Sequence, residues 1–205
     1  MSALPPSLLD HSTITVVDID ETQLRNNTYA HVKVRGNIET HSFPPNSFDL
    51  IVCHDVIEHL DYVDQAITQF HNALAPEGLL FIGAPNPESF SGFVTRVTPH
   101  WFHVWFYRVI LKREHAGLPG HAPFPTVYHP LVSPRALLTF CENINFNLIY
   151  SNKYTSVGYT RVRERRPILG WLLYVTTGLI NTLFLGQRDV RLGNYHVIFE
   201  KRGAP

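Results

Sequence analysis

Residues 47–60 read SFDLIVCHDVIEHL, a largely apolar run followed by a polar segment. Phe48–Cys53 has the length and character of a strand buried inside a parallel sheet. The acidic residues Asp55 and Glu58 follow, where negative charge favours the N-terminus of a helix. The stretch therefore predicts one strand–helix unit of an α/β fold.

The flanking sequence predicts further strands of the same sheet. Thr13–Ile19 is apolar and β-branched, which indicates a buried parallel strand, and His31–Gly36 alternates apolar with basic residues. Gly78–Ala84 is another apolar run, and Phe146–Tyr154 and Asn194–Lys201 predict two late strands. Because apolar strands need cover on both faces, we expect an α/β sheet of the Rossmann type.

Helices are predicted between these strands. Glu21–Asn27 follows the first strand, and from Val63 onward the apolar residues fall on one helical face. Asp61 is placed to cap that second helix. A later helix is predicted at Ser133, an N-cap residue followed by proline at the first helical position.

Composition bounds the class of protein. The 205 residues, 44% of them hydrophobic, suit one domain, 1–205. Equal numbers of basic and acidic residues, 17 each, argue against nucleic acid as a partner. Cys53 and Cys141 lack metal-ligand spacing, and prolines interrupt the short apolar start of the chain, so a cytoplasmic location is expected.

Two segments depart from the strand–helix order. Residues 86–132 are predicted to form a substrate-covering insertion, with an irregular, aromatic and histidine-rich part at 90–128. Residues 167–186 are apolar and follow Arg161, Arg163, Arg165 and Arg166. A single membrane crossing there would leave the two late strands on opposite sides of the bilayer. We expect instead either a helical cap over the site or a helix that rests on a membrane surface. In the second case residues 161–186 would contact anionic headgroups.

Five ordered motifs resemble those of class I S-adenosylmethionine-dependent methyltransferases. They are Val17–Asp20, Gly36–Glu39, Ser47–Val52, Asp55–Leu60 and Leu74–Gly78. The resemblance covers residues 14–146 and the last strand, and it is closest in kind to small-molecule enzymes such as the ubiquinone-biosynthesis O-methyltransferases. It implies a sheet with its last strand antiparallel, S-adenosylmethionine as the cofactor, and a small, apolar methyl acceptor.

The resemblance also assigns cofactor contacts near the first predicted strand. Asp18 stands at its end, where a carboxylate can accept hydrogen bonds from both ribose hydroxyls. Ile19, the next residue, is also assigned to the cofactor. The alternative is that Asp18 or, with better placement, Asp20 caps the following helix.

Further contacts are implied after the next two strands. Asn37 stands where the family has an aspartate that accepts from the adenine amino group, and an amide oxygen can do the same. Ile38 would offer a backbone N–H and an apolar contact to adenine, or would belong to the core. His54 is expected beside the methionine part of the cofactor, or on a surface loop.

One element of the family pattern has no counterpart in this sequence. The family opens with a strand and a glycine-rich turn, whose N–H groups face the cofactor carboxylate. Residues 1–12 contain no glycine and are too short for a strand, a turn and a crossover helix. The sequence therefore predicts a sheet truncated at its N-terminus. It would lack the strand that, in the family, lies between the two strands assigned here to Ile14 and Phe48. Such a chain is either an enzyme or a non-catalytic remnant of one.

No catalytic residue is assigned, because an in-line methyl transfer needs a base only when the acceptor must lose a proton. Candidates for a base are His59, His100, His103 and His129, each with a structural role as the alternative.

Two further groups of residues leave alternatives open. Asp55, Glu58 and His59 follow a pattern with which ubiquinone enzymes hold a divalent ion, but the same residues start a helix in metal-free relatives, and no metal is predicted. The aromatic run Trp101–Tyr107 lines an acceptor pocket or belongs to the core.

Overall fold

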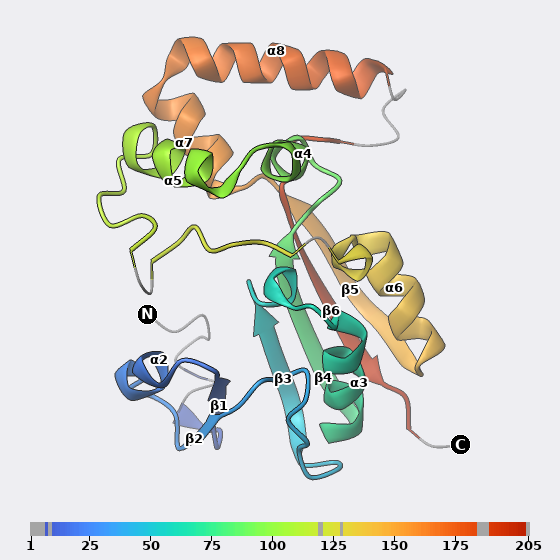
Figure 1. Cartoon of the computed structure of the whole chain (residues 1–205). Helices are drawn as coiled ribbons and strands as arrows, with labels where there is room; N and C mark the ends of the chain where they lie inside the picture. The colour runs from blue at the N-terminus through green and yellow to red at the C-terminus, as the bar shows by residue number, and fades with distance from the viewer. Residues whose placement is uncertain (1–6, 8–9, 119–120, 128, 184–188, 204–205) are drawn as a thin grey trace.

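The computed structural model describes residues 7, 10–118, 121–127, 129–183 and 189–203 (Figure 1). The strands are β1 (Thr15–Asp18), β2 (Val32–Arg35), β3 (Phe48–His54), β4 (Leu74–Pro85), β5 (Phe146–Tyr154) and β6 (Asn194–Lys201). The α-helices are α2 (Glu21–Asn26), α3 (Val63–Ala73), α4 (Phe90–Val97), α5 (His100–Val109), α6 (Pro134–Asn143), α7 (Val157–Arg165) and α8 (Pro167–Leu183). Two short 3-10 helices, η1 (Ile57–His59) and η2 (Pro130–Val132), complete the described elements.

The described strands form two separate sheets. Strands β1 and β2 pair in parallel, with Asp18 opposite Arg35. The larger sheet has the order β3-β4-β6-β5, in which β3 and β4 are parallel and β6 is antiparallel to both of its neighbours. The expected antiparallel last strand is confirmed. Strands β1 and β3 therefore belong to different sheets.

The core lies on one face of the larger sheet. Along β6 the buried residues Tyr195, Val197 and Phe199 alternate with less buried ones, because successive strand side chains point to opposite faces. They meet Ile67 of α3 and Leu137 of α6, both fully buried. Helices α3 and α6 thus cover the same face of the sheet (Figure 1).

The opposite face is less covered, contrary to the expectation of cover on both faces. It presents Val52, which is exposed, and Phe81 and Ile198, which are only partly buried. Strand β1 was also expected to be buried, yet all four of its residues are of intermediate exposure. A strand is buried on both faces only when other layers pack on both sides of its sheet, and the exposure of β1 and β2 shows that this small sheet lacks such cover.

A buried carboxylate connects the loop after β2 to the larger sheet. Glu39 Oε1 accepts a hydrogen bond of 2.6 Å from the backbone N–H of Tyr62, the N-cap residue of α3. Asp61 therefore does not cap this helix, which was the expectation, and the cap position has no side-chain cap bond of its own. A side chain distant in sequence takes over one donor of the helix start.

The remaining capping predictions are confirmed. Asp20 caps α2 by accepting from the backbone N–H groups of Thr22 and Gln23, at 2.7 and 3.3 Å. Ser133 caps α6 by accepting from Ala136, at 3.3 Å. These bonds satisfy N–H groups that have no partner inside the helix.

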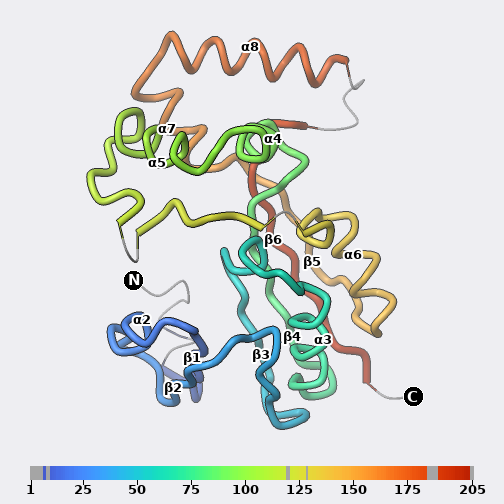
Figure 2. The backbone as a smooth tube through the Cα atoms, in the orientation of Figure 1, coloured from blue at the N-terminus to red at the C-terminus, as the bar shows by residue number. Residues whose placement is uncertain are grey.

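The middle of the chain is more regular than expected. Residues 90–128, predicted to be irregular, contain α4 and α5. Together with α7 and α8 these helices lie at the end of the larger sheet to which β3 and β4 point (Figure 1). Figure 2 shows the chain leaving β4 toward α4 and α5 and then crossing back toward α6. No helix of the described residues is both long enough and apolar enough to cross a bilayer.

Candidate functional site

The candidate site begins where β3 ends. Asp55 has a left-handed backbone, with φ of 53°, and its N–H donates to the carbonyl of Gly83 at 2.8 Å. This turn brings Asp55 Oδ2 to 3.1 Å from Nδ1 of His54. The contact leaves Nε2 of His54 as the basic ring nitrogen. Carboxyl ends of parallel strands are the usual place for ligands in α/β sheets.

A second imidazole lies beside His54 across the sheet. His54 and His196 are both in register with Gly83 of the intervening strand, and their ring centroids are 5.5 Å apart. A Cβ at position 83 would lie 2.5 Å from Cδ2 of His54 and 3.0 Å from Cδ2 of His196. Only glycine therefore leaves room for both rings over the central strand.

The two imidazoles have opposite electrostatic tendencies. The hydrogen bond to Asp55 raises the pKa of His54, although partial burial opposes the shift. Burial, together with the positive charge of His54, lowers the pKa of His196. Tyr154 Oη lies 2.7 Å from Nε2 of His196, and a neutral imidazole can accept the phenolic proton there.

Glu58 is a buried carboxyl group in η1, the 3-10 helix that follows β3. It is 4% exposed, and burial raises its pKa to about 7. Its Oε2 has no hydrogen-bond partner among the described residues. Its backbone carbonyl accepts from the N–H of Val127 at 2.8 Å, which attaches the 121–127 segment to η1.

Asp55, Glu58 and His59 do not converge on a common point. Asp55 faces His54, and Nδ1 of His59 is 2.7 Å from the carbonyl of Pro125. Within the described part of the chain, no three His, Cys, Asp or Glu side chains are grouped so that they could hold a metal ion. The residues of this motif instead start a 3-10 helix, the alternative that the sequence left open.

Asp18 and Ile19 lie at the end of β1, as predicted. Asp18 Oδ1 accepts from the backbone N–H of Asp20 at 2.8 Å, whereas Asp20 caps the helix. Among the described residues Oδ2 of Asp18 has no such bond, so it is available to a ligand. Ile19 is 69% exposed, an unusual position for a large apolar side chain unless something covers it.

Asn37 and Ile38 are less open to a ligand. Asn37 Oδ1 already accepts from the backbone N–H of Glu39 at 2.9 Å, and its Nδ2 donates to the Glu39 carboxylate at 3.0 Å. One lone pair of the amide oxygen remains for adenine. Ile38 packs against the hydrophobic core, which favours its structural alternative.

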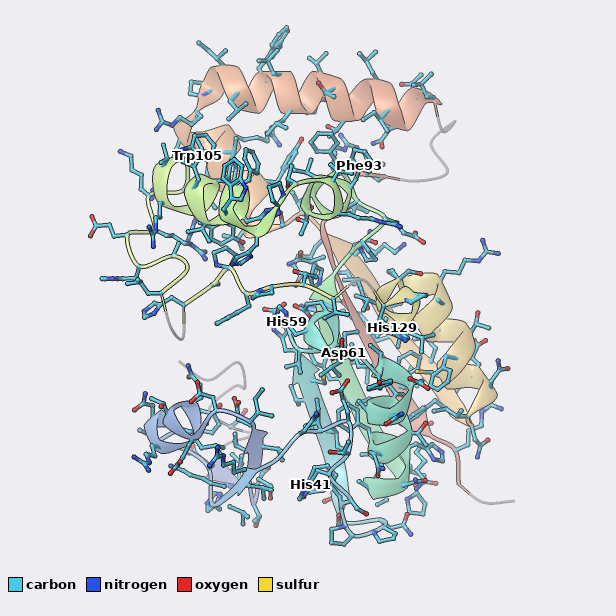
Figure 3. The ribbon with its side chains drawn as sticks, in the orientation of Figure 1. His41, His59, Asp61, Phe93, Trp105 and His129 are labelled. Atoms are coloured by element: carbon cyan, nitrogen blue, oxygen red, sulfur yellow. The ribbon has the colours of Figure 1, made fainter. Side chains whose placement is uncertain are left out.

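The histidines considered as bases have local partners. Nε2 of His103 lies 3.1 Å from Oγ1 of Thr98, and Nδ1 of His129 accepts from the N–H of Leu131 at 3.2 Å. His59 is the last residue of η1, Figure 3 shows His129 beside α6, and His100 is an exposed residue at the start of α5. The structural role is therefore favoured for His59, His103 and His129.

The aromatic run Trp101–Tyr107 forms much of α5 and is not core. Trp101 and Trp105 are exposed, and the rings of Phe102 and Trp105 are 5.5 Å apart. The core alternative is therefore wrong for these two tryptophans.

Sequence reasoning missed His196, Tyr154 and Gly83. They come from β6, β5 and β4, so no local pattern relates them to His54. A histidine in the otherwise apolar Tyr195–Phe199 run was the one available signal.

Comparisons with known proteins agree with this architecture. The sequence profile of a methyltransferase-domain family matches residues 2–82. No curated protein matches the sequence.

Solved structures share the fold at low sequence identity. A S-adenosylmethionine-dependent methyltransferase from Archaeoglobus fulgidus is 15% identical with a TM-score of 0.55, over 91% of this chain and 75% of its own. One from Methanosarcina mazei is 15% identical with a TM-score of 0.52, over 93% and 82%.

The cyclase SpnF is 13% identical with a TM-score of 0.52, over 94% of this chain and 67% of its own. Because a cyclase shares it, the fold alone does not specify the reaction. The profile that matches residues 2–82 is that of a methyltransferase domain, and the chain shares the fold of S-adenosylmethionine-dependent methyltransferases.

Proposed function

We propose that this protein transfers a methyl group from S-adenosylmethionine to a small, apolar acceptor. The observation that carries the proposal is the family match over β1 to β4, combined with polar side chains at the ends of β1 and β3. Asp18 and the His54–Asp55 pair occupy those two ends.

The cofactor would be held by the five residues assigned from the sequence. Oδ2 of Asp18 would accept from the ribose hydroxyls, and Ile19 would cover the adenosine with apolar surface. Asn37 and Ile38 would border the adenine, and His54 would border the methionine part. When bound, the cofactor supplies an electrophilic methyl group on a sulfonium.

An acceptor that loses a proton needs a base close to the methyl group. His54 suits this role better than the four histidines considered first, because Asp55 engages Nδ1 and leaves Nε2 basic. Because its pKa is raised, His54 would be a stronger base than an ordinary histidine once it has lost its proton.

The apolar character of the acceptor is supported by the segment after β4. Residues 86–132 place exposed tryptophans on α5, at the end of the sheet to which β3 and β4 point (Figure 1). We propose that this segment covers the acceptor within a single domain. The proposal includes a cytoplasmic location with contact to a membrane surface through residues 161–186, of which 184–186 lie outside the described residues.

A second candidate is a non-catalytic remnant of the same fold. The observation that favours it is the break between β1 and β3, together with the glycine content. None of the 12 glycines forms a Gly-x-Gly pair, so the turn that would receive the cofactor carboxylate is missing from the sequence. The residues present therefore fit the adenosine part of the cofactor better than its amino-acid part.

Calorimetric titration of the 205-residue chain with S-adenosylhomocysteine tests the proposal. Binding in the micromolar range, abolished by Asp18→Ala and kept by Asp49→Ala, would support the enzyme. Asp49 is an exposed aspartate near the start of β3, which makes it a matched control. Absence of binding would favour the remnant.

A further inference from the structure

Helix α8 buries its small and polar face and exposes its apolar face, which is the reverse of an ordinary surface helix. Its residues facing the protein are small or polar, among them Gly170 and Thr177, which are buried. Its large apolar residues point outward, with Ile168 78%, Leu179 64% and Leu183 82% exposed. Surface helices of globular proteins normally bury the apolar stripe and expose the polar face.

The exposed side chains form a continuous stripe. Ile168, Trp171, Leu172, Leu179 and Leu183 lie on one helical face, because they are separated by intervals of three, four and seven residues. We name these five residues the α8 stripe. Contiguous exposed apolar surface of this kind marks a site of interaction with a protein or a membrane.

Polar contacts hold the helix in this orientation. Nδ2 of Asn181 donates to Asp189 at 2.9 Å, while its Oδ1 accepts from the N–H of Val190 at 2.9 Å. At the other end Gly170 contacts α7 closely, because a Cβ there would lie 2.6 Å from Cα of Arg163. The outward direction of the stripe is therefore set by specific contacts on the inner face.

The neighbouring helices α4 and α5 add apolar surface at the same end of the larger sheet. Trp101, Trp105 and Val109 are exposed at four-residue intervals along α5, as are Phe93 and Val97 on α4. Figure 3 shows Phe93 and Trp105 in the part of the molecule next to α8. Tryptophan and tyrosine are typical of the boundary between headgroups and hydrocarbon.

The charge of this region differs from that of the whole chain. Residues 90–113 and 157–183 contain eight Lys or Arg residues and one acidic residue, Glu164, although the chain has a formal charge of zero. Arg163, Arg165 and Arg166 are exposed directly before α8. An apolar stripe beside clustered arginines is the combination that binds bilayers of anionic lipid.

We propose that the α8 stripe inserts into the surface of an anionic phospholipid bilayer, with the arginines at the end of α7 contacting the headgroups. This specifies the membrane contact included in the proposed function. Since β3 and β4 point toward α4, α5, α7 and α8 (Figure 1), the His54 end of the sheet would face the bilayer. An apolar acceptor dissolved in the lipid would then reach the site from that side.

Vesicle flotation of the full chain tests this without any methyl transfer. We expect binding to vesicles of equimolar phosphatidylcholine and phosphatidylglycerol, and less to phosphatidylcholine alone. Leu179→Gln should lower the partition coefficient roughly tenfold, because it removes one buried leucine. Ile149→Gln is the control, since Ile149 is 49% exposed on β5 and should leave binding unchanged.

The headgroup contact has a separate variant. Arg165→Glu with Arg166→Glu should weaken binding to the anionic vesicles at least tenfold, because each arginine contributes about 1 kcal/mol. Binding to phosphatidylcholine alone should not change. Circular dichroism of each variant confirms that it is folded.

Several outcomes would overturn the proposal. One is no binding to either vesicle by the folded chain, and another is equal binding of Leu179→Gln and the wild type. Sedimentation that shows a dimer broken by Leu179→Gln would assign the stripe to a second copy of the chain. Arginine-dependent binding to duplex DNA with no effect of Leu179→Gln would assign the basic face to nucleic acid. Calorimetry with S-adenosylhomocysteine is independent of all these results.

Discussion

Helices α3 and α8 are both surface helices, and they direct their apolar residues in opposite directions. In α3, Val63, Ala66 and Ile67 are fully buried against the sheet. In α8, Ile168 and Leu183 are among the most exposed large side chains of the described residues. The comparison shows that apolar periodicity predicts a helix but not the surface that covers its apolar face. For α3 that surface is the protein, and for α8 we propose that it is lipid.

The largest expected effect comes from a matched pair of substitutions that shorten one apolar side chain in each helix. Ile67→Ala should lower the free energy of unfolding by roughly 3 kcal/mol, because it leaves a cavity under α3. Leu179→Ala on α8 should change it by less than about 0.5 kcal/mol, since an exposed side chain loses little packing. Urea unfolding of the soluble chain measures both. Equal costs would mean that the α8 stripe is buried in solution.

A second test uses the carboxyl group buried near the start of α3. The folded chain raises the pKa of Glu58 from 4.5 to about 7, so it retains a proton that the unfolded chain releases. Between these pH values the free energy of unfolding should therefore fall as pH rises. Glu58→Gln should remove this slope and stabilise the protein by roughly 3 kcal/mol at pH 8.

Denaturation across this pH range, with Glu164→Gln as the control on exposed α7, measures the effect of Glu58. Equal pH slopes for the wild type and Glu58→Gln between pH 4.5 and 7 would contradict the raised pKa of this carboxyl group.

The smallest effect compares the two faces of α8 itself. Gly170→Ala should destabilise the protein by about 1 kcal/mol or more, because the added methyl group meets the backbone of Arg163. Gly178→Ala has nothing within 4 Å and should stabilise the helix by up to about 1 kcal/mol. Thermal denaturation distinguishes the signs. The same sign for both variants would show that α8 does not rest on α7 through Gly170.

Short-range patterns account for most correct predictions. The Asp20 and Ser133 caps and the 3.6-residue spacing of α3 depend on neighbouring residues only. Strand β3 has the predicted position, but the prediction that it is buried is wrong, because one face of the sheet is little covered and only Cys53 is buried. The Asp61 cap failed because Glu39, from a distant loop, binds the backbone of Tyr62 instead. Helices α4 and α5 were missed because their aromatic residues face outward and lack a core-facing pattern.

The sequence by itself determined the order of the strands, the likeness of residues 2–82 to a methyltransferase domain and the positions of Asp18 and His54 at strand ends, since these follow from local propensity and ordered motifs. Only the tertiary structure decided that β6 lies between β4 and β5, which places His196 beside His54 over Gly83. It alone decided that the α8 stripe faces outward. Both depend on contacts between residues far apart in the chain, and no local pattern carries that information.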